Sequence, residues 1–178
     1  MLNFKGDMIM TKEQQPTLSE KDWPEMRKLK ASNKSGWMYF EHLVKTIYKH
    51  LGEEKTCEIL SDLMRDNARR LLVPGMKSFG ITGNDAWAVA SYFKLATGDV
   101  IGYKAELERV SPKKVIYRLF APCLWFPKLD IPHTFCEAMG SFEKEAAKII
   151  NPKIKVTCNK LMTAGASCCE FVFEEEDS

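Results

Sequence analysis

Cysteine is the residue type in this sequence most able to do chemistry, because a thiolate is both a nucleophile and a metal ligand. Five of the six cysteines fall in the last third of the chain, at positions 123, 136, 158, 168 and 169, whereas Cys57 stands alone upstream. We expect only the later cysteines to converge. Burial as a small apolar side chain is the alternative for each of them, because free cysteine is among the most buried residue types.

His133 and Cys136 are three residues apart where a helix is expected to begin. This spacing puts two side chains on one helix face, and the first turn of a helix favours a thiolate over a thiol. Cys136 is therefore a candidate nucleophile with His133 as its acid or base, and a surface imidazole is the alternative for His133. Zinc is a further alternative, with Cys123, His133, Cys136 and Cys169 as ligands, although the sequence lacks two tight ligand pairs.

Cys168 and Cys169 open a segment that reads as a strand, in which neighbouring side chains face opposite sides of the sheet. Only one of the two thiols can therefore face a core. Cys169 shares the register of Phe171 and Phe173 and is the better inward candidate, but the sequence alone leaves both open.

Aromatic residues flank these cysteines, at Trp125, Phe126 and Phe135. They would line an apolar ligand pocket if they faced inward, and ordinary core packing is the alternative. Glycine-rich phosphate loops, the serine-hydrolase elbow and the H-E-x-x-H zinc motif are all missing from the sequence. Nucleotide-dependent chemistry and serine hydrolysis therefore have no support.

The composition narrows the class of protein further. The 178 residues carry 26 Lys and Arg against 24 Asp and Glu, a net charge of +2, which lacks the concentrated positive charge of a nucleic-acid-binding protein. No apolar run approaches the roughly 18 residues of a membrane helix, and the start lacks the apolar centre of a signal peptide. We expect a cytoplasmic protein with reduced thiols, bound to neither nucleic acid nor membrane.

The elements that must position the cysteines begin with helices. Residues 1–20 show no apolar period and predict a mobile arm, and residues 21–178 predict a single domain. Three helices are predicted in the first half: Trp37 to Leu51 with Gly52 as its stop, residues 53–72 before Pro74-Gly75, and residues 84–96 with Asn84 or Asp85 as N-cap.

Strands dominate the second half. Alternating side chains predict one hairpin over residues 103–120 and another formed by Lys153–Met162 and Cys168–Phe173. Between them lie a loop over residues 121–131 and a helix from Pro132 to Ile149 with a bend at Gly140. The fold class is therefore α+β, with N-terminal helices packed on an antiparallel sheet of about four strands.

The second half also resembles a known family. The C-terminal signature of the L-2-amino-thiazoline-4-carboxylic acid hydrolase-like proteins is similar to Asn151-Pro152-Lys153-Ile154-Lys155-Val156, Lys160-Leu161-Met162 and Gly165-Ala166-Ser167-Cys168-Cys169-Glu170-Phe171. The likeness extends upstream to Arg118-Leu119-Phe120-Ala121-Pro122-Cys123 and to Cys136-Glu137, and it covers residues 35–175. Those proteins are similar in turn to the 4-vinyl reductase small-molecule-binding domain.

This resemblance implies a hydrolase that opens a small cyclic amidine or thiazoline ring, or a relative that keeps the pocket without the reaction. The family's cysteines correspond to Cys123, Cys136 and Cys169 here. The enzyme would use Cys136 or Cys169 to attack the C=N carbon, with His133 or Glu137 moving protons.

The residues support two functions from different classes. Cysteine-dependent hydrolysis of a C–N bond needs a cation for the substrate carboxylate, and Arg118 is the nearby candidate, with Trp125, Phe135 and Glu137 around the substrate. Binding or sensing of a hydrophobic or aromatic ligand without catalysis is the alternative.

A homodimer is also expected. Trp37, Tyr39 and Tyr48 add apolar surface beyond the main apolar stripe of the first helix. Such a surface on a monomer favours association with a second copy.

Overall fold

The computed structural model describes residues 24–176 and contains two compact units, Met1–Met38 and Tyr39–Ser178. In the first unit the described residues are helical from Glu25 onward. The remaining elements belong to the second unit. The predicted arm, residues 1–20, lies outside the described residues, and the single domain over residues 21–178 stays a prediction.

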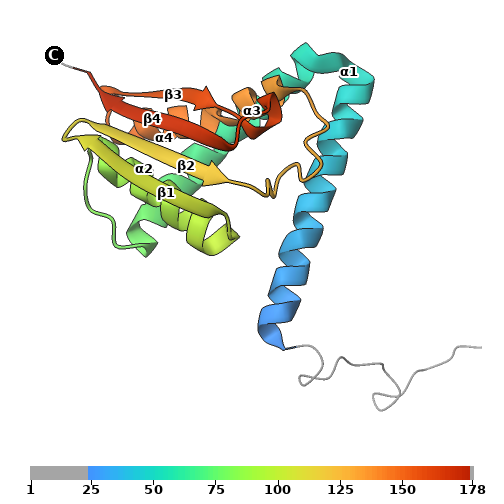
Figure 1. The fold of residues 1–178 in the computed structure, drawn as a ribbon, viewed down its shortest axis with the longest axis horizontal. Coiled ribbons are helices and arrows are strands. Elements are labelled where there is room, and N and C mark those ends of the chain that lie inside the picture. The colour runs from blue at the N-terminus through green and yellow to red at the C-terminus, as the bar shows by residue number, and fades with distance from the viewer. Residues whose placement is uncertain (1–23, 177–178) are drawn as a thin grey trace, which may run out of the picture. The chain divides into compact units, whose positions relative to one another are not determined.

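Helices precede and flank a four-stranded antiparallel sheet, which confirms the α+β fold class (Figure 1). The helical elements are α1 (Glu25–Ser78), α2 (Ala86–Phe93), the π-helix η2 (Lys94–Ile101), α3 (His133–Met139), α4 (Ser141–Ile150) and the 3-10 turn η3 (Met162–Ala164). The strands are β1 (Lys104–Ser111), β2 (Lys114–Phe120), β3 (Ile154–Lys160) and β4 (Cys168–Glu175). No helix of the described residues is long and apolar enough to cross a membrane.

The first two predicted helices are both part of α1. The helical path breaks at Gly52, whose φ of 77° and ψ of 178° suit a residue without Cβ. The predicted end before Pro74-Gly75 was wrong, because α1 continues to Ser78. Glycine is needed at position 75, where a Cβ would lie 2.5 Å from the Tyr92 ring.

The third predicted helix is α2, and it begins where the sequence indicated. Asp85 is its N-cap, since Oδ1 accepts a hydrogen bond from the Ala88 backbone N–H at 2.8 Å. The helix does not end near residue 96 but passes directly into η2. Gly98 lets η2 approach β1 closely, because a Cβ there would lie 2.9 Å from Ala105 Cβ.

The strand order of the sheet is β1-β2-β4-β3, so the two predicted hairpins lie side by side through the β2–β4 pair. Val115 pairs with Phe173 and Tyr117 with Phe171, and all four side chains are buried. They define the face of the sheet that α2 and α4 cover (Figure 1).

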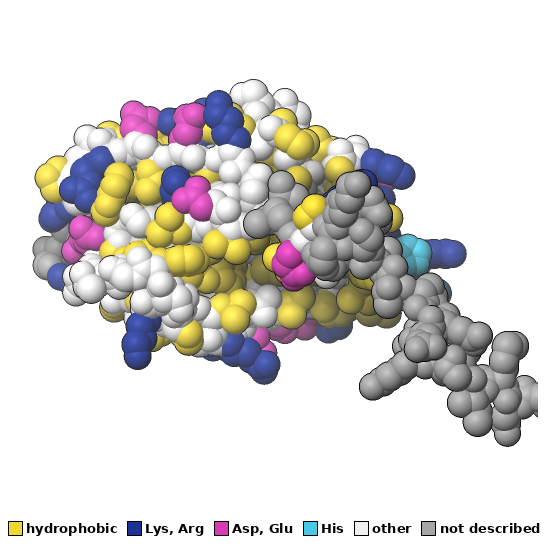
Figure 2. Space-filling view, turned by 90° about the horizontal axis from the view of Figure 1, so that it is seen from below, with side chains coloured by type: hydrophobic (Ala, Val, Ile, Leu, Met, Phe, Trp, Pro, Cys, Tyr) yellow, Lys and Arg dark blue, Asp and Glu magenta, His cyan; other side chains and the backbone are white. Residues whose placement is uncertain are grey.

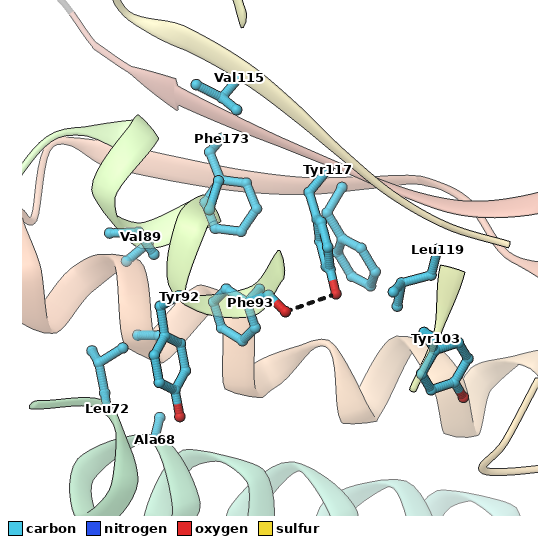
Figure 3. Close-up of a cluster of buried hydrophobic side chains, with 14 of the residues drawn as sticks. Ala68, Leu72, Val89, Tyr92, Phe93, Tyr103, Val115, Tyr117, Leu119 and Phe173 are labelled. Atoms are coloured by element: carbon cyan, nitrogen blue, oxygen red, sulfur yellow. Dashed lines mark hydrogen bonds between the residues drawn. The ribbon is translucent and has the colours of Figure 1, made fainter. Parts of the chain in front are cut away.

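The core of the second unit extends from this face of the sheet through α2 to α1 (Figure 3). Phe93 on α2 stacks between Tyr117 and Phe173, with ring centroids 6.1 and 5.9 Å away. Tyr117 donates a hydrogen bond from its hydroxyl to the Phe93 carbonyl at 3.3 Å. Leu72 of α1 is buried on the side of this core that lies away from the sheet.

The predicted helix after the loop is divided at Gly140 into α3 and α4, in agreement with the expected bend. Its buried stripe differs from the expected one at the C-terminal end. Ala146 and Ala147 are fully buried, whereas Ile149 is 38% exposed. The helix is therefore rotated so that position 143 faces the sheet rather than position 149.

Candidate functional site

Four free thiols lie in one region at the end of the covered face: Cys123, Cys136, Cys158 and Cys169, which we call the thiol cluster, although no three of them are close enough to share a metal ion. They come from the loop after β2, from α3, from β3 and from β4. The other three thiols lie close enough to Cys136 to act on its pKa electrostatically. Sequence reasoning brought together three of these residues but left out Cys158.

Strand alternation places Cys169 in the cluster and Cys168 outside it. Cys169 pairs in register with Leu119, whose neighbour Tyr117 is part of the core. Its Sγ accepts a hydrogen bond from the Met162 backbone N–H at 3.4 Å. Cys168 is buried on the opposite side of β4, in register with Phe120.

Cys123 holds the loop that follows β2. Its Sγ lies 3.6 Å from the Tyr103 hydroxyl oxygen and accepts a hydrogen bond from the Phe126 backbone N–H at 3.4 Å. The same hydroxyl oxygen accepts hydrogen bonds from the backbone N–H groups of Leu124 and Trp125, at 2.8 and 3.1 Å. These contacts give Cys123 a structural part in the loop.

Burial keeps the other thiols of the cluster protonated. It raises the pKa of Cys136 to about 12, of Cys158 to about 12 and of Cys169 to about 11. The expectation that a helix start would favour the Cys136 thiolate was therefore wrong. Loss of solvent around the sulfur outweighs the partial charge of the short helix α3.

His133 and Glu137 do not join the cluster. Their side chains are 54% and 56% exposed, and His133 Nε2 lies 3.9 Å from Glu137 Oε1. Cys136 instead belongs to the inward face of α3, where it packs against the core. The expected shared face of His133 and Cys136 is thus not formed, because the helix turns the histidine to solvent.

Arg118 also lies apart from the thiols. In β2 it alternates with the buried Tyr117 and Leu119, so it faces the other side of the sheet. There its Nε and Nη1 contact Glu170 at 2.7 Å and Glu108 at 2.6 Å. The pKa of the buried Glu170 is lowered by its hydrogen bond to Arg118, so this arginine is already paired and not available to a ligand at the cluster.

The expected aromatic residues lie in the core around the loop. Phe135 is fully buried, with its ring 5.2 Å from that of Tyr48. Trp125 is partly buried and packs edge-on against Phe40 at 5.0 Å.

Sequence reasoning missed Glu143, which α4 places toward the sheet. Its side chain is partly accessible, yet protein surrounds the carboxyl closely enough for burial to raise its pKa to about 7. Glu143 acts electrostatically on Tyr117, Cys158 and Cys169, one residue from each of three strands. The signal in the sequence was a glutamate between Phe142 and Ala146, inside the apolar stripe of a predicted helix.

Thr163 on η3 is a second polar group missed at this site. Its Oγ1 is buried and has no hydrogen-bond partner of regular geometry among the described residues. The hydroxyl nevertheless lies near enough to Cys136 to favour the thiolate slightly against the effect of burial.

In the part of the chain that is described, no set of side chains is arranged to bind a metal ion. Within residues 24–176 no group of three or more His, Cys, Asp or Glu side chains is arranged to hold a metal ion. The zinc alternative would need His133 to face Cys123, Cys136 and Cys169, and it faces Glu137 instead.

Comparison with known proteins gives a fold and no family. No family model and no curated protein matches the chain. A trafficking protein particle complex subunit 3 from Naegleria fowleri, covalently bound to palmitic acid, has a similar structure, with a TM-score of 0.59, 12% identity and coverage of 83% of this chain and 97% of that one. An H-NOX domain from Shewanella oneidensis in the Fe(II)CO ligation state matches with a TM-score of 0.52, 12% identity and coverage of 78% and 74%. At this identity the likeness concerns the fold alone.

Proposed function

We propose that this protein binds a small, mainly apolar molecule between the helices and the sheet, beside the thiol cluster. One observation carries the proposal: Cys136, Cys158 and Cys169 face the helix-covered side, yet each keeps partial solvent accessibility. Side chains on the covered face of a fully packed sheet would be closed off. Apolar walls with a few polar groups are typical of small-molecule sites.

The two structural neighbours support ligand binding rather than any one ligand. The trafficking subunit was solved with palmitic acid attached, and the H-NOX domain with CO on iron. The fold can therefore enclose quite different molecules, and the side chains of each chain decide which. Here the apolar residues and protonated thiols favour a hydrophobic or aromatic ligand, which is also what the resemblance to the 4-vinyl reductase small-molecule-binding domain implies.

A substitution that places a larger side chain in the proposed binding site tests this proposal. We would measure binding of Nile red, a neutral apolar dye, to the full chain and to the variants Cys136→Met and Cys168→Met. The larger side chain at position 136 should weaken dye binding about tenfold, since it occupies the space at the cluster. Cys168→Met is the matched control, because Cys168 is buried on the other face of β4. No dye binding, or equal loss in both variants, would refute the proposal.

Ring-opening hydrolysis of a cyclic amidine or thiazoline is a second proposal, and the observation that favours it is Glu143 beside Cys158 and Cys169. A carboxyl with a pKa of about 7 suits proton transfer near neutral pH better than the exposed His133 does. Water would add its oxygen to the C=N carbon and its protons to the leaving nitrogen as the ring C–N bond breaks.

Turnover and thiol reactivity decide between hydrolysis and binding alone. The full chain, Cys136→Ser and Glu143→Gln would be incubated with 2-amino-thiazoline-4-carboxylate, and a product with the mass of one added water would be sought. Alkylation followed by mass spectrometry would rank the native thiols. A product that both variants lose supports the hydrolase, whereas slow alkylation throughout the cluster without product leaves ligand binding as the function.

A further inference from the structure

The loop that follows β2, residues 121–132, joins the two layers of the fold at the thiol cluster. It starts two residues after Leu119, which pairs in register with Cys169, and it ends at the start of α3, the helix that carries Cys136. Between these two ends it runs along α1 (Figure 1). The loop therefore closes the edge between the sheet and α3, the two layers between which we place the ligand.

The loop has an inner side that is buried and an outer side that faces solvent. Phe126 is fully buried and Ile131 is 7% exposed, so both side chains pack in the core. The residues between them, 127–130, are exposed. A segment with this pattern covers the apolar interior and can move away from it without breaking a helix or a strand.

The first half of the loop is fixed to the connection between η2 and β1. The Tyr103 hydroxyl oxygen accepts hydrogen bonds from the backbone N–H groups of Leu124 and Trp125, and it lies 3.6 Å from Cys123 Sγ. The same sulfur accepts a hydrogen bond from the Phe126 N–H. One buried tyrosine therefore holds this half of the loop in place.

The second half of the loop is fixed to α1 by an ion pair at the surface. Lys45 Nζ donates hydrogen bonds to both carboxylate oxygens of Asp130, at 2.8 and 3.0 Å. The two side chains are 32% and 51% exposed. An exposed ion pair contributes little stability, so this contact can break and re-form easily.

The backbone of this second half is strained beside the ion pair. Leu129 has a φ of 51°, a left-handed conformation that residues with a Cβ rarely adopt. Its N–H donates a hydrogen bond to the Phe126 carbonyl at 2.9 Å, which closes a tight turn directly before Asp130. The turn is thus held in an unfavourable conformation, and release of Asp130 would let it relax.

We propose that residues 127–131 form a lid over the ligand site and that the ion pair of Lys45 and Asp130 is its latch. The ligand enters and leaves the space beside the thiol cluster when the latch opens, while Tyr103 keeps the first half of the loop in place. This inference rests on the proposed ligand-binding function and names the entrance to the site. Lids of this kind open on a timescale of microseconds to milliseconds.

A latch has a kinetic signature that a ligand-binding contact lacks. The ion pair stabilises the closed lid in the free protein and in the complex alike, so its loss speeds entry and exit by the same factor. The association and dissociation rate constants should therefore both rise, about threefold for an exposed pair, with little change in Kd. Loss of a residue that contacts the ligand would instead change Kd, mainly through the dissociation rate constant.

Stopped-flow fluorescence of Nile red with the full chain measures both rate constants. Lys45→Met, Asp130→Ala and the double variant should each show the rise, and the double variant should be no faster than the faster single variant, because all three lack the same pair. Lys114→Met is the matched control, since Lys114 and Glu174 form an ion pair of similar exposure, 35% and 52%, between β2 and β4. It should leave both rate constants unchanged.

The outcomes separate the lid from the binding site. If Nile red binds but the three variants keep the rate constants of the full chain, or change Kd through dissociation alone, the lid is overturned while ligand binding stands. An equal rise of both rate constants in Lys114→Met would also overturn the lid. If Nile red fails to bind the full chain, the proposed function falls and this inference falls with it. Circular dichroism shows first that each variant is folded, and Lys45→Gln replaces Lys45→Met if the methionine variant is not.

Discussion

At the scale of single residues, desolvation decides what the ionisable groups of this protein do. It raises the pKa of Cys136 to about 12 and of Glu143 to about 7, and in neither case does the described part of the chain provide an opposite charge beside the group to reverse the effect. Burial therefore disfavours the thiolate form of Cys136 near neutral pH. The carboxyl becomes the group at the site whose charge changes there.

Glu143 should also affect stability, and the sign follows from linkage. Its folded-state pKa of about 7 lies above the ordinary value of 4.5, so the folded protein binds this proton more tightly than the unfolded chain. Stability is greatest below the ordinary value and falls as the pH rises to about 7. Glu143→Gln should remove that fall and raise the free energy of unfolding at about pH 8 by about 1–3 kcal/mol.

Urea unfolding of the full chain and of Glu143→Gln at about pH 4.5 and about pH 8 measures this difference. The two proteins should be closer in stability at the lower pH, where Glu143 is neutral in both the folded and the unfolded state for a large part of the molecules. A variant that is less stable than the full chain at about pH 8 would show that Glu143 has a stabilising partner.

At the scale of elements, helix ends and glycines fix how the site is built. The Asp85 cap starts α2, which carries Phe93 to the sheet, and η2 then leads to β1 through the short connection of Gly102 and Tyr103. Gly98 permits the close approach of η2 to Ala105. This connection from η2 to β1 sets the position of Tyr103, whose hydroxyl group contacts Cys123 Sγ.

Removal of the cap should destabilise the fold without changing the binding site. Asp85→Ala loses the 2.8 Å hydrogen bond to the Ala88 N–H and should lower the free energy of unfolding by about 1 kcal/mol. Asp85→Asn, which keeps a side-chain acceptor, should lose less. Thermal melts followed by circular dichroism report the change, and equal losses in the two variants would argue against the capping role.

At the scale of the whole molecule, the described surface exposes several large apolar side chains. Tyr39 is 74% exposed, Leu43 56%, Leu51 54% and Tyr48 39%, and all belong to α1. Figure 2 shows hydrophobic side chains gathered across the middle of one face of the molecule, flanked by charged ones. Exposed apolar side chains in this number favour association.

The homodimer expected from the sequence therefore stays a prediction with a direct test. Sedimentation at micromolar concentration should show a dimer, and the double variant Tyr39→Lys, Leu43→Glu should shift it to a monomer with little change in melting temperature, since both residues are exposed. A monomer before any substitution would refute the dimer.

The sequence by itself determined the features that depend on local physics. Apolar spacing indicated the helices and both hairpins, Asn84 or Asp85 marked the start of α2, and the alternation of Phe171 and Phe173 made Cys169 the better inward candidate. Each follows from short-range geometry, a period of 3.6 or 2 residues or a hydrogen bond within one turn.

Only the tertiary structure decided the chemistry of the site. The helix-start effect on Cys136 is local and weak, whereas its desolvation comes from segments far apart in the sequence. Arg118 pairs with Glu170 across neighbouring strands, and Glu143 acts electrostatically on Cys158 and Cys169 because α4 turns its alanines into the core. A pKa and a partner depend on which groups the fold brings within a few ångströms, and the spacing of residues along one chain does not contain that information.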